Sequence, residues 1–357
     1  MQPSDLALFW AGVIACAIMV YVILDGFDLG VGILFGTTAD QTRRARMMNT
    51  IAPFWDGNET WLVLVGAGLF AAFPDAYAVF LGAFYFPVLL LLFGLIFRGI
   101  AFEFRYRTER MRHVWDRGFF LGSTVVAFVQ GAAVGAMMRG IPVTNGQYAG
   151  SAFSWLHPFA ILTGIGLVLG YALLGASWLV LKSEGDLHDW ASHRLRWLAA
   201  GVLTVLFLAF TVTFDYSVLA RNNLQARAWG LVFPAIGVLA LAVILARATK
   251  QGDKLPFAMT ILFFLASFLS LAVMFWPYMI PYSITVANAA APDASLRFFL
   301  YAGVVVLPII VIYTIGVYWV FRGKFREAGF YERSNAAEVA DFRGSTDKKG
   351  GTSSGIG

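Results

Sequence analysis

The 357-residue sequence has little charge and a single cysteine, and both shortages narrow the class of protein. Only 13% of its residues are charged, whereas 59% are hydrophobic, and the mean hydropathy is +0.72. A water-soluble core could not bury that much apolar surface, so the composition predicts an integral membrane protein. The lone thiol, Cys16, lies in an apolar run, which excludes a disulfide framework, an iron–sulfur cluster and a thiolate zinc site.

Histidine is missing from the interior of the apolar runs. The chain has four histidines; three are expected in loops, and His157 directly precedes a run that starts with proline. A haem held between helices would therefore lack its usual ligand, and we expect no haem, metal or other cofactor in this chain. The sequence also has no Walker loop, no GxGxxG after a strand and no HExxH.

Nine apolar runs predict an all-α integral membrane protein with about nine transmembrane helices. A spanning helix needs about 20 mostly apolar residues, and the runs are continuous instead of alternating, which excludes a β-barrel. The membrane domain is expected over 1–324, and the polar segment 325–357 is expected to be a disordered cytoplasmic tail or a remnant added to the native chain. The runs cover 6–24 (continuing through a glycine-rich stretch to 36), 51–73, 76–97, 118–138, 158–181, 197–214, 228–246, 255–277 and 298–321.

The basic residues predict the orientation of the chain in the membrane. Of the 26 lysines and arginines, 21 fall in the segments on one side, four fall on the other side, and Arg98 lies inside a run. Because basic loops stay in the cytoplasm, the N-terminus is expected outside and the C-terminus in the cytoplasm. The net charge of +5 is then an orientation signal, and no nucleic-acid partner is expected.

Six ionisable residues gather near the predicted cytoplasmic ends of the first three runs. Charged groups at membrane depth are costly, so each needs a partner or a function. Asp25 and Asp28 are three residues apart and therefore share one helical face. The six are Asp25, Asp28, Asp56, Glu59, Arg98 and Glu103.

Two interpretations of this group remain open at the level of sequence. It could form a proton-accessible pocket that opens to the cytoplasm, with Arg98 as the countercharge. Alternatively, Asp56-x-x-Glu59 fits a capping box at a helix start, and Asp25 and Asp28 could pair with Arg98 only to hold three helices together. The two interpretations are compatible for Asp56.

Glycine and proline patterns predict packing and helix ends. Small-xxx-small pairs let helix backbones approach closely, and ordinary packing within one chain explains them. Three prolines after Phe275 are expected to end the eighth run at the outer surface. The glycine pairs are Gly26 with Gly30, Gly131 with Gly135, and Gly166 with Gly170.

Five segments carry a resemblance to a known family: YVILDGFDLGVG, IAPFWDGNETW, LFAAFP, FRGIAFEFR and FWPYMIPYSITVANAAAP. Together they closely resemble subunit II of the cytochrome bd-type quinol oxidases, and most of all the cyanide-insensitive branch. The resemblance covers nearly the whole chain, from about residue 6 to residue 324, and this combination of segments is specific.

The resemblance implies a fold and a complex. The fold would have two four-helix bundles, over about 6–138 and 156–277, and a peripheral helix over about 298–321. The family works as a heterodimer in the bacterial inner membrane, where subunit I carries the haems (b and d, or b only) and the quinol-oxidising loop. The complex oxidises quinol at the outer face and reduces dioxygen to water with cytoplasmic protons. Subunit II is haem-free; some members hold a structural quinone, and a small single-span accessory subunit is a further potential partner.

The resemblance also implies roles for individual positions. Asp56, in the WDGN motif, would belong to the cytoplasmic proton path. Asp28 and Arg98 would keep the haem region of the partner intact, and Trp61 would lie near a hydrophobic oxygen route. Glu59 stands where some relatives have glutamine, so an extra acid is expected at the proton entry. With the acidic group above, the expected proton path comprises Asp56, Glu59, Asp25 and Glu103.

The favoured interpretation is the haem-free subunit of a bd-type quinol oxidase, which supports its haem-bearing partner and contributes a cytoplasmic proton path. Two other classes stay open. A secondary transporter or channel could use the group Asp25, Asp28, Asp56 and Arg98, although that group lies at one membrane face and not at the midplane. The third class is a passive assembly scaffold without a proton role.

Overall fold

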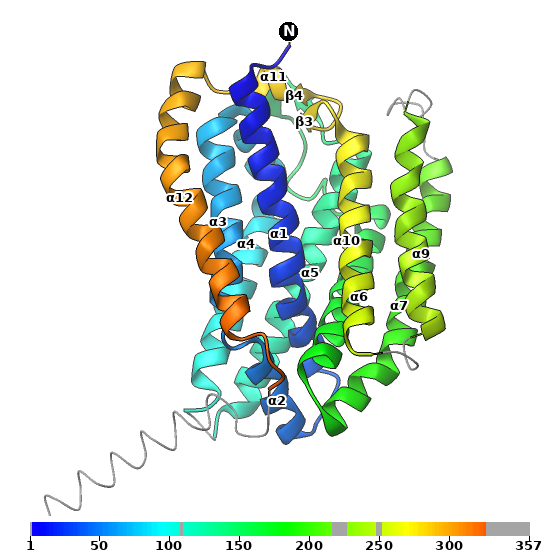
Figure 1. Cartoon of the computed structure of the whole chain (residues 1–357). Coiled ribbons are helices and arrows are strands. Elements are labelled where there is room, and N and C mark those ends of the chain that lie inside the picture. The colour runs from blue at the N-terminus through cyan, green and yellow to red at the C-terminus, as the bar shows by residue number, and fades with distance from the viewer. Residues whose placement is uncertain (1, 108–109, 216–226, 248–251, 326–357) are drawn as a thin grey trace, which may run out of the picture.

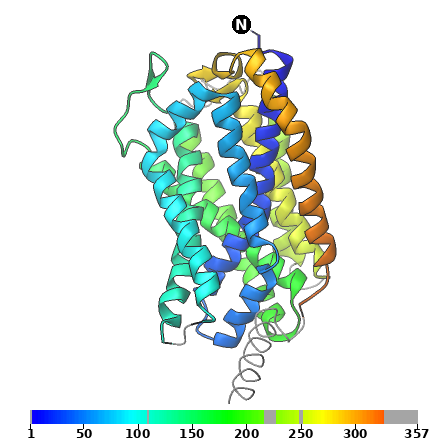
Figure 2. The ribbon, with the colours of Figure 1, turned by 90° about the vertical axis from the view of Figure 1, so that its left-hand side faces the viewer.

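The computed structural model describes residues 2–107, 110–215, 227–247 and 252–325, and long helices lie side by side in it (Figure 1; Figure 2). The expected tail lies almost entirely outside these residues. The elements are α1 (Asp5–Phe35), α2 (Gln41–Ile51), α3 (Trp55–Ala72), α4 (Pro74–Phe104), α5 (Arg112–Arg139), β1 (Val143–Thr144), β2 (Gln147–Tyr148), α6 (Pro158–Lys182), α7 (Gly185–Asp215), η1 (Ala228–Leu231), α9 (Val232–Arg247), α10 (Lys254–Phe275), β3 (Tyr278–Ile280), β4 (Ile284–Thr285), α11 (Val286–Ala289) and α12 (Asp293–Val320).

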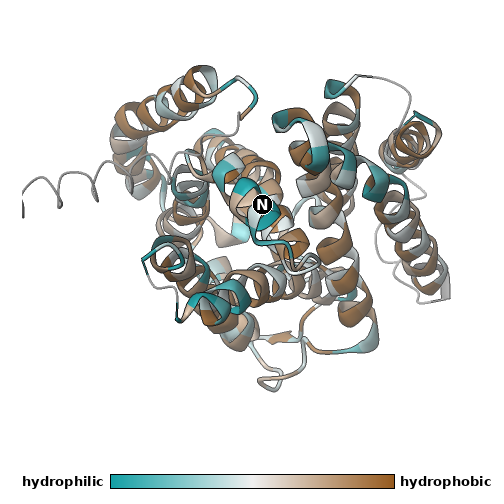
Figure 3. Cartoon of the chain, turned by 90° about the horizontal axis from the view of Figure 1, so that it is seen from below, coloured by the Kyte–Doolittle hydropathy of each residue, from teal (hydrophilic) through white to brown (hydrophobic). Residues whose placement is uncertain are grey.

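Eight helices in the described residues are long and apolar enough to cross a membrane. The chain is therefore an all-helical, multi-pass membrane protein, as its composition predicts. The expected span over 51–73 corresponds to α3, which is not among the eight and which carries Asp56, Asn58 and Glu59 in its first turns. Hydrophobic residues predominate along the helices (Figure 3), and many large ones are exposed, among them Trp197 at 81% and Phe298 at 78%.

Several helix boundaries differ from those that the apolar runs predict. The run expected to start at Ile51 is preceded by α2, a short polar helix that ends at that residue. Helix α7 begins at Gly185, so His188 and His193 lie in this helix and not in a loop, and His113 likewise belongs to the first turn of α5. Helices extend past the hydrocarbon region with polar turns, so hydropathy alone predicts them too short.

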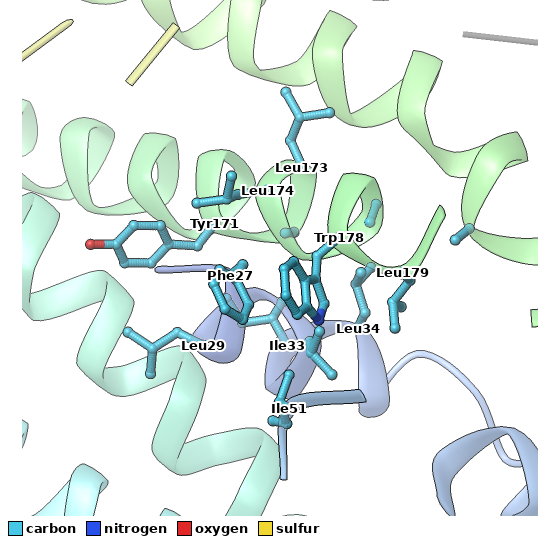
Figure 4. Close-up of a cluster of buried hydrophobic side chains, with 14 of the residues drawn as sticks. Phe27, Leu29, Ile33, Leu34, Ile51, Tyr171, Leu173, Leu174, Trp178 and Leu179 are labelled. Atoms are coloured by element: carbon cyan, nitrogen blue, oxygen red, sulfur yellow. The ribbon is translucent and has the colours of Figure 1, made fainter. Parts of the chain in front are cut away.

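Helices α1 and α6 cross with their backbones in contact. A Cβ atom added to Gly30 would lie 1.8 Å from the carbonyl oxygen of Tyr171, and one added to Gly175 would lie 2.4 Å from the carbonyl carbon of Gly30. Beside this crossing Phe27 stacks on Trp178, with ring centroids 4.0 Å apart (Figure 4). The prediction that Gly26 and Gly30 serve packing within the chain is confirmed, since both face Tyr171 of α6.

Short strands and a short helix lie at the end of the molecule that holds the N-terminus (Figure 1). Helix α10 ends at Phe275, as the prolines predict, and β3, β4 and α11 follow it near the N-terminus (Figure 1). Trp10 of α1 donates from Nε1 to the carbonyl oxygen of Leu296, at 3.2 Å, which fastens the start of α12. Helix α12 lies along α1 and α3. Of the residues in its most apolar stretch, only 6% are buried, so most of this helix is exposed.

Candidate functional site

Arg98 lies near the end of α4, and its side chain is fully buried at 0% exposure. Its Nη1 donates to Oδ1 of Asp25 at 2.7 Å and lies 3.4 Å from Oε1 of Glu59. Its Nη2 lies 4.0 Å from Oδ2 of Asp28. One guanidinium therefore meets carboxylates from two other helices, α1 and α3, near the end of the molecule where α2 lies (Figure 1).

Asn58 extends this contact to a fourth helix. Its Nδ2 donates to Oδ2 of Asp28 at 2.7 Å and to the carbonyl oxygen of Leu24 at 3.2 Å. Its Oδ1 accepts a hydrogen bond of 3.1 Å from the hydroxyl of Tyr318 in α12. Sequence reasoning gave Asn58 and Tyr318 no role, although an amide beside two acids in WDGNETW was a visible signal.

We call Asp25, Asp28, Asn58, Glu59 and Arg98 the Arg98 cluster. It holds three carboxyl groups against one guanidinium. Several of its buried atoms have no hydrogen-bond partner in the described residues: Asp25 Oδ2, Asp28 Oδ1, Glu59 Oε1, and Arg98 Nε and Nη2. A buried polar atom without a partner costs about 1–3 kcal/mol. The carboxyl oxygens among these atoms can accept a hydrogen bond from water or a transferred proton, whereas the two arginine nitrogens can only donate.

Asp56 does not cap α3, so the capping-box hypothesis is wrong. The residue before the first turn is Phe54, and no side chain makes a capping hydrogen bond there. Glu59, its expected capping partner, pairs with Arg98 instead. Asp56 is exposed in the first turn of α3 and lies within electrostatic range of Glu59.

Burial increases from the surface into the Arg98 cluster. Asp56 is exposed, the side chain of Glu59 is 23% exposed, and those of Asp25, Asp28 and Arg98 are 0% exposed. Because acids three residues apart share a helical face, the start of α3 connects the surface to the buried pair.

The other two expected site residues lie outside the Arg98 cluster. Glu103 is exposed at the end of α4, and among the described residues it forms no ion pair with the cluster. Trp61 is 7% exposed and packs with Ala17 and Tyr21. Its buried Nε1 has no hydrogen-bond partner in the part of the chain that the structure describes.

A hydrogen-bonded chain lies next to the cluster on the α5 and α6 side. Gln130 donates from Nε2 to the hydroxyl of Tyr21 at 2.8 Å, and the hydroxyl of Tyr171 donates to Oε1 of Gln130 at 2.8 Å. Tyr21 and Tyr171 both lie within electrostatic range of Asp25. Sequence reasoning missed this chain, although Gln130 is the one amide in its apolar run.

The described residues contain no group of three or more His, Cys, Asp or Glu side chains placed to hold a metal ion. The Arg98 cluster itself consists of carboxyl, amide and guanidinium groups, whose chemistry is ion pairing, hydrogen bonding and proton exchange.

Comparisons with known proteins agree over most of the chain. A family model described as cytochrome bd terminal oxidase subunit II matches residues 6–321. The chain is 31% identical over 360 residues to cytochrome bd-I ubiquinol oxidase subunit 2 of Escherichia coli (strain K12), covering 89% of this chain and 95% of that protein. It is also 31% identical to cytochrome bd ubiquinol oxidase subunit 2 of Bacillus subtilis (strain 168), covering 88% of this chain and 95% of that protein. A chain in the structure of bd oxidase from Geobacillus thermodenitrificans has the same fold, with a TM-score of 0.74 at 16% identity, covering 89% of this chain and 98% of that one.

Proposed function

Because the chain belongs to the cytochrome bd terminal oxidase subunit II family, we propose that its Arg98 cluster carries protons from the cytoplasm toward a haem-bearing partner. Membership makes the chain a subunit of a membrane oxidoreductase complex, a bd-type oxidase of a bacterial respiratory chain. The relatives are named as subunit 2, which implies a subunit I as partner. The proton path and the finer roles below are the proposal.

The gradation of burial from Asp56 to Asp25 carries the proposal. An exposed carboxylate can exchange protons with water, and Glu59 lies between it and the guanidinium of Arg98. Three carboxyl groups face the one guanidinium of Arg98, so one of them can take up a proton while Arg98 keeps a charged partner. Asp56 is the entry group, Glu59 the relay, and Asp25 the inner acceptor. Glu103, which is exposed and apart, serves at most as a proton collector at the surface.

The same cluster supports the fold beside the partner. Arg98 ties α4 to α1, while Asp28 is tied through Asn58 to Tyr318 of α12. We assign to Asp28 and Arg98 the role of holding these helices in the arrangement that the haem-bearing subunit packs against. Trp61 lines the proposed oxygen route at the α1–α3 contact.

The proposal includes a topology and a division of cofactors. The N-terminus lies outside and the C-terminus in the cytoplasm, α3 completes nine spans, and two four-helix bundles are flanked by α12. Subunit I holds haems b and d, or b only, and oxidises quinol, whereas this chain holds no haem. A structural quinone and a small accessory subunit are compatible with this arrangement, and no contacts are assigned to either.

The Asp56→Asn variant tests the proton role. An amide cannot deliver a proton, so oxygen reduction by the purified complex should fall about tenfold or more, while haem content per complex stays near that of the wild type. Asp75→Asn is the matched control, because Asp75 is an exposed acid in the first turn of α4 and lies outside the cluster. Wild-type turnover in an intact Asp56→Asn complex would show that this carboxylate carries no protons.

A further inference from the structure

A basic cleft lies on the same end of the molecule as α2, outside the Arg98 cluster. It has a volume of about 550 Å³ between the end of α1, the start of α2 and the first turns of α5. None of the residues of the proposed proton path lines this cleft. Its lining includes Gln41, Arg44, Arg112, His113, Arg117 and Phe120.

Among the described residues that line the cleft, the positive charge exceeds what the one acid, Asp116, can neutralise. Asp116 accepts from Arg105 at 2.6 Å and from Arg44 at 2.8 Å, so its two oxygens are already engaged. Arg112 and Arg117 form no ion pair within the described residues. Three arginines, Arg44, Arg112 and Arg117, therefore line the cleft, and the one carboxylate among its described lining residues is already paired.

Two further features favour an anion in this cleft. The Nε atom of Arg112 is buried and has no hydrogen-bond partner in the described part of the chain. Helix α5 starts at the cleft without any side-chain cap, so its first amides and its dipole add positive potential. A guanidinium fork matches phosphate oxygens in two-pronged geometry, which favours a phosphate over a halide.

The cleft also has an apolar wall at the membrane edge. The ring of Phe120 covers Gly36, so close that a Cβ on this glycine would lie 2.2 Å from the ring. Val114 and Leu121, exposed at 39% and 54%, continue an apolar surface on α5. A phosphate in the cleft would therefore lie beside a surface suited to acyl chains.

We propose that this cleft binds the phosphate headgroup of an anionic phospholipid, held by Arg44, Arg112 and Arg117. Basic pockets at the ends of membrane helices are suited to such headgroups. Asp116 and Arg105 hold Arg44 in place from behind, and Phe120 adjoins the first acyl carbons. The site fastens α1, α2 and α5 together through a lipid.

A titration of the lipid-depleted two-subunit complex tests this site, with the shift in unfolding temperature as readout. Micelles with phosphatidylglycerol should stabilise the wild-type complex, whereas micelles with phosphatidylcholine should not. In the Arg112→Gln/Arg117→Gln variant the midpoint of the titration should move to about tenfold higher lipid, because hydrogen bonds from charged groups are lost. Arg322→Gln, which removes an exposed arginine at the end of α12, should behave as the wild type.

A second variant keeps the test decisive if the double variant does not assemble. Arg117 is exposed, so Arg117→Gln leaves the packing intact. It should move the midpoint of the titration to about two- to fivefold higher lipid. Equal stabilisation by both lipids, or an unchanged midpoint in both variants, would overturn the proposal. A full shift with inorganic phosphate alone would also overturn it, since the site would then belong to a soluble anion.

Discussion

At the scale of single residues, Arg98 determines how the site works. Moving a guanidinium out of water is costly, and here the cost is offset by the hydrogen bond to Asp25 and by the nearby Glu59 and Asp28. Removing one member of a buried ion pair destabilises the protein more than removing both members, because the remaining charge stays buried without a partner. The stability of the cluster should therefore fall when one charge is removed and fall less when both charges of a pair are removed together.

Arg98→Ala should destabilise the subunit by about 3–5 kcal/mol, because it leaves buried acids without their cation. The expected result is a lower yield of complex and a lower haem absorbance per subunit. In the double variant Arg98→Ala/Asp25→Asn, part of the yield should return, since one uncompensated charge is gone. Normal yield and spectra in the single variant would mean that Arg98 reaches water by extending its side chain.

The sequence predicted the charged part of the site because charges in apolar runs have few partners to choose from. Asp25, Asp28 and Arg98 had to meet, and they do. Asn58 and Gln130 were missed, since a neutral amide at membrane depth costs less than a charge and stands out less. The motif also could not show where α3 begins. Phe54 and not Asp56 precedes its first turn, so Asp56 lies two residues past the capping position.

At the scale of elements, the crossing of α1 and α6 fixes where Asp25 and Asp28 lie. Gly30 follows both acids on the same helix, and its contact with Tyr171 and Gly175 sets the depth and rotation of α1. The run pattern predicted the long helices well, because an apolar stretch in lipid must be helical. It could not predict α2, whose polar residues show no membrane signal and whose buried face depends on the neighbouring helices.

Gly30→Ala should separate α1 from α6 and destabilise the subunit by about 1–3 kcal/mol or more, because the added methyl meets backbone atoms that cannot move aside. The measurement is the unfolding temperature of the purified complex, together with its haem content. Gly12→Ala is the matched control on the same helix, since its Cβ would meet nothing within 4 Å. Equal stability of the two variants would contradict the close crossing as the support of the site.

At the scale of the whole molecule, the outer faces of the helices must be covered by lipid or by another subunit. Exposed aromatic and aliphatic side chains run along α3, α4 and α12, among them Phe70, Phe97 and Ile312 at 64%, 55% and 69%. The high content of hydrophobic residues in the sequence already predicted that many apolar side chains would face outward. It could not indicate which face meets subunit I, because both lipid and a membrane partner select apolar residues.

A complex purified through a tag on this chain should contain a second, larger polypeptide and absorb visible light with haem bands. The physical reason is that the interiors of the apolar runs hold no histidine and the relatives are named as subunit 2, so we expect the haem to come with a partner. The measurement is an optical spectrum with the subunit ratio from the same sample. A colourless preparation of the chain alone would favour the transporter or channel interpretation.

The most direct test of the central claim is the rate of proton uptake during oxygen reduction, followed with a pH-indicating dye, in wild-type and Asp25→Asn complexes of equal haem content. Asp25 is the buried acid closest to Arg98 and should receive protons that enter at Asp56. We expect uptake in the variant to slow by about tenfold or more. Uptake at the wild-type rate would contradict a proton path through this cluster and leave it a supporting role alone.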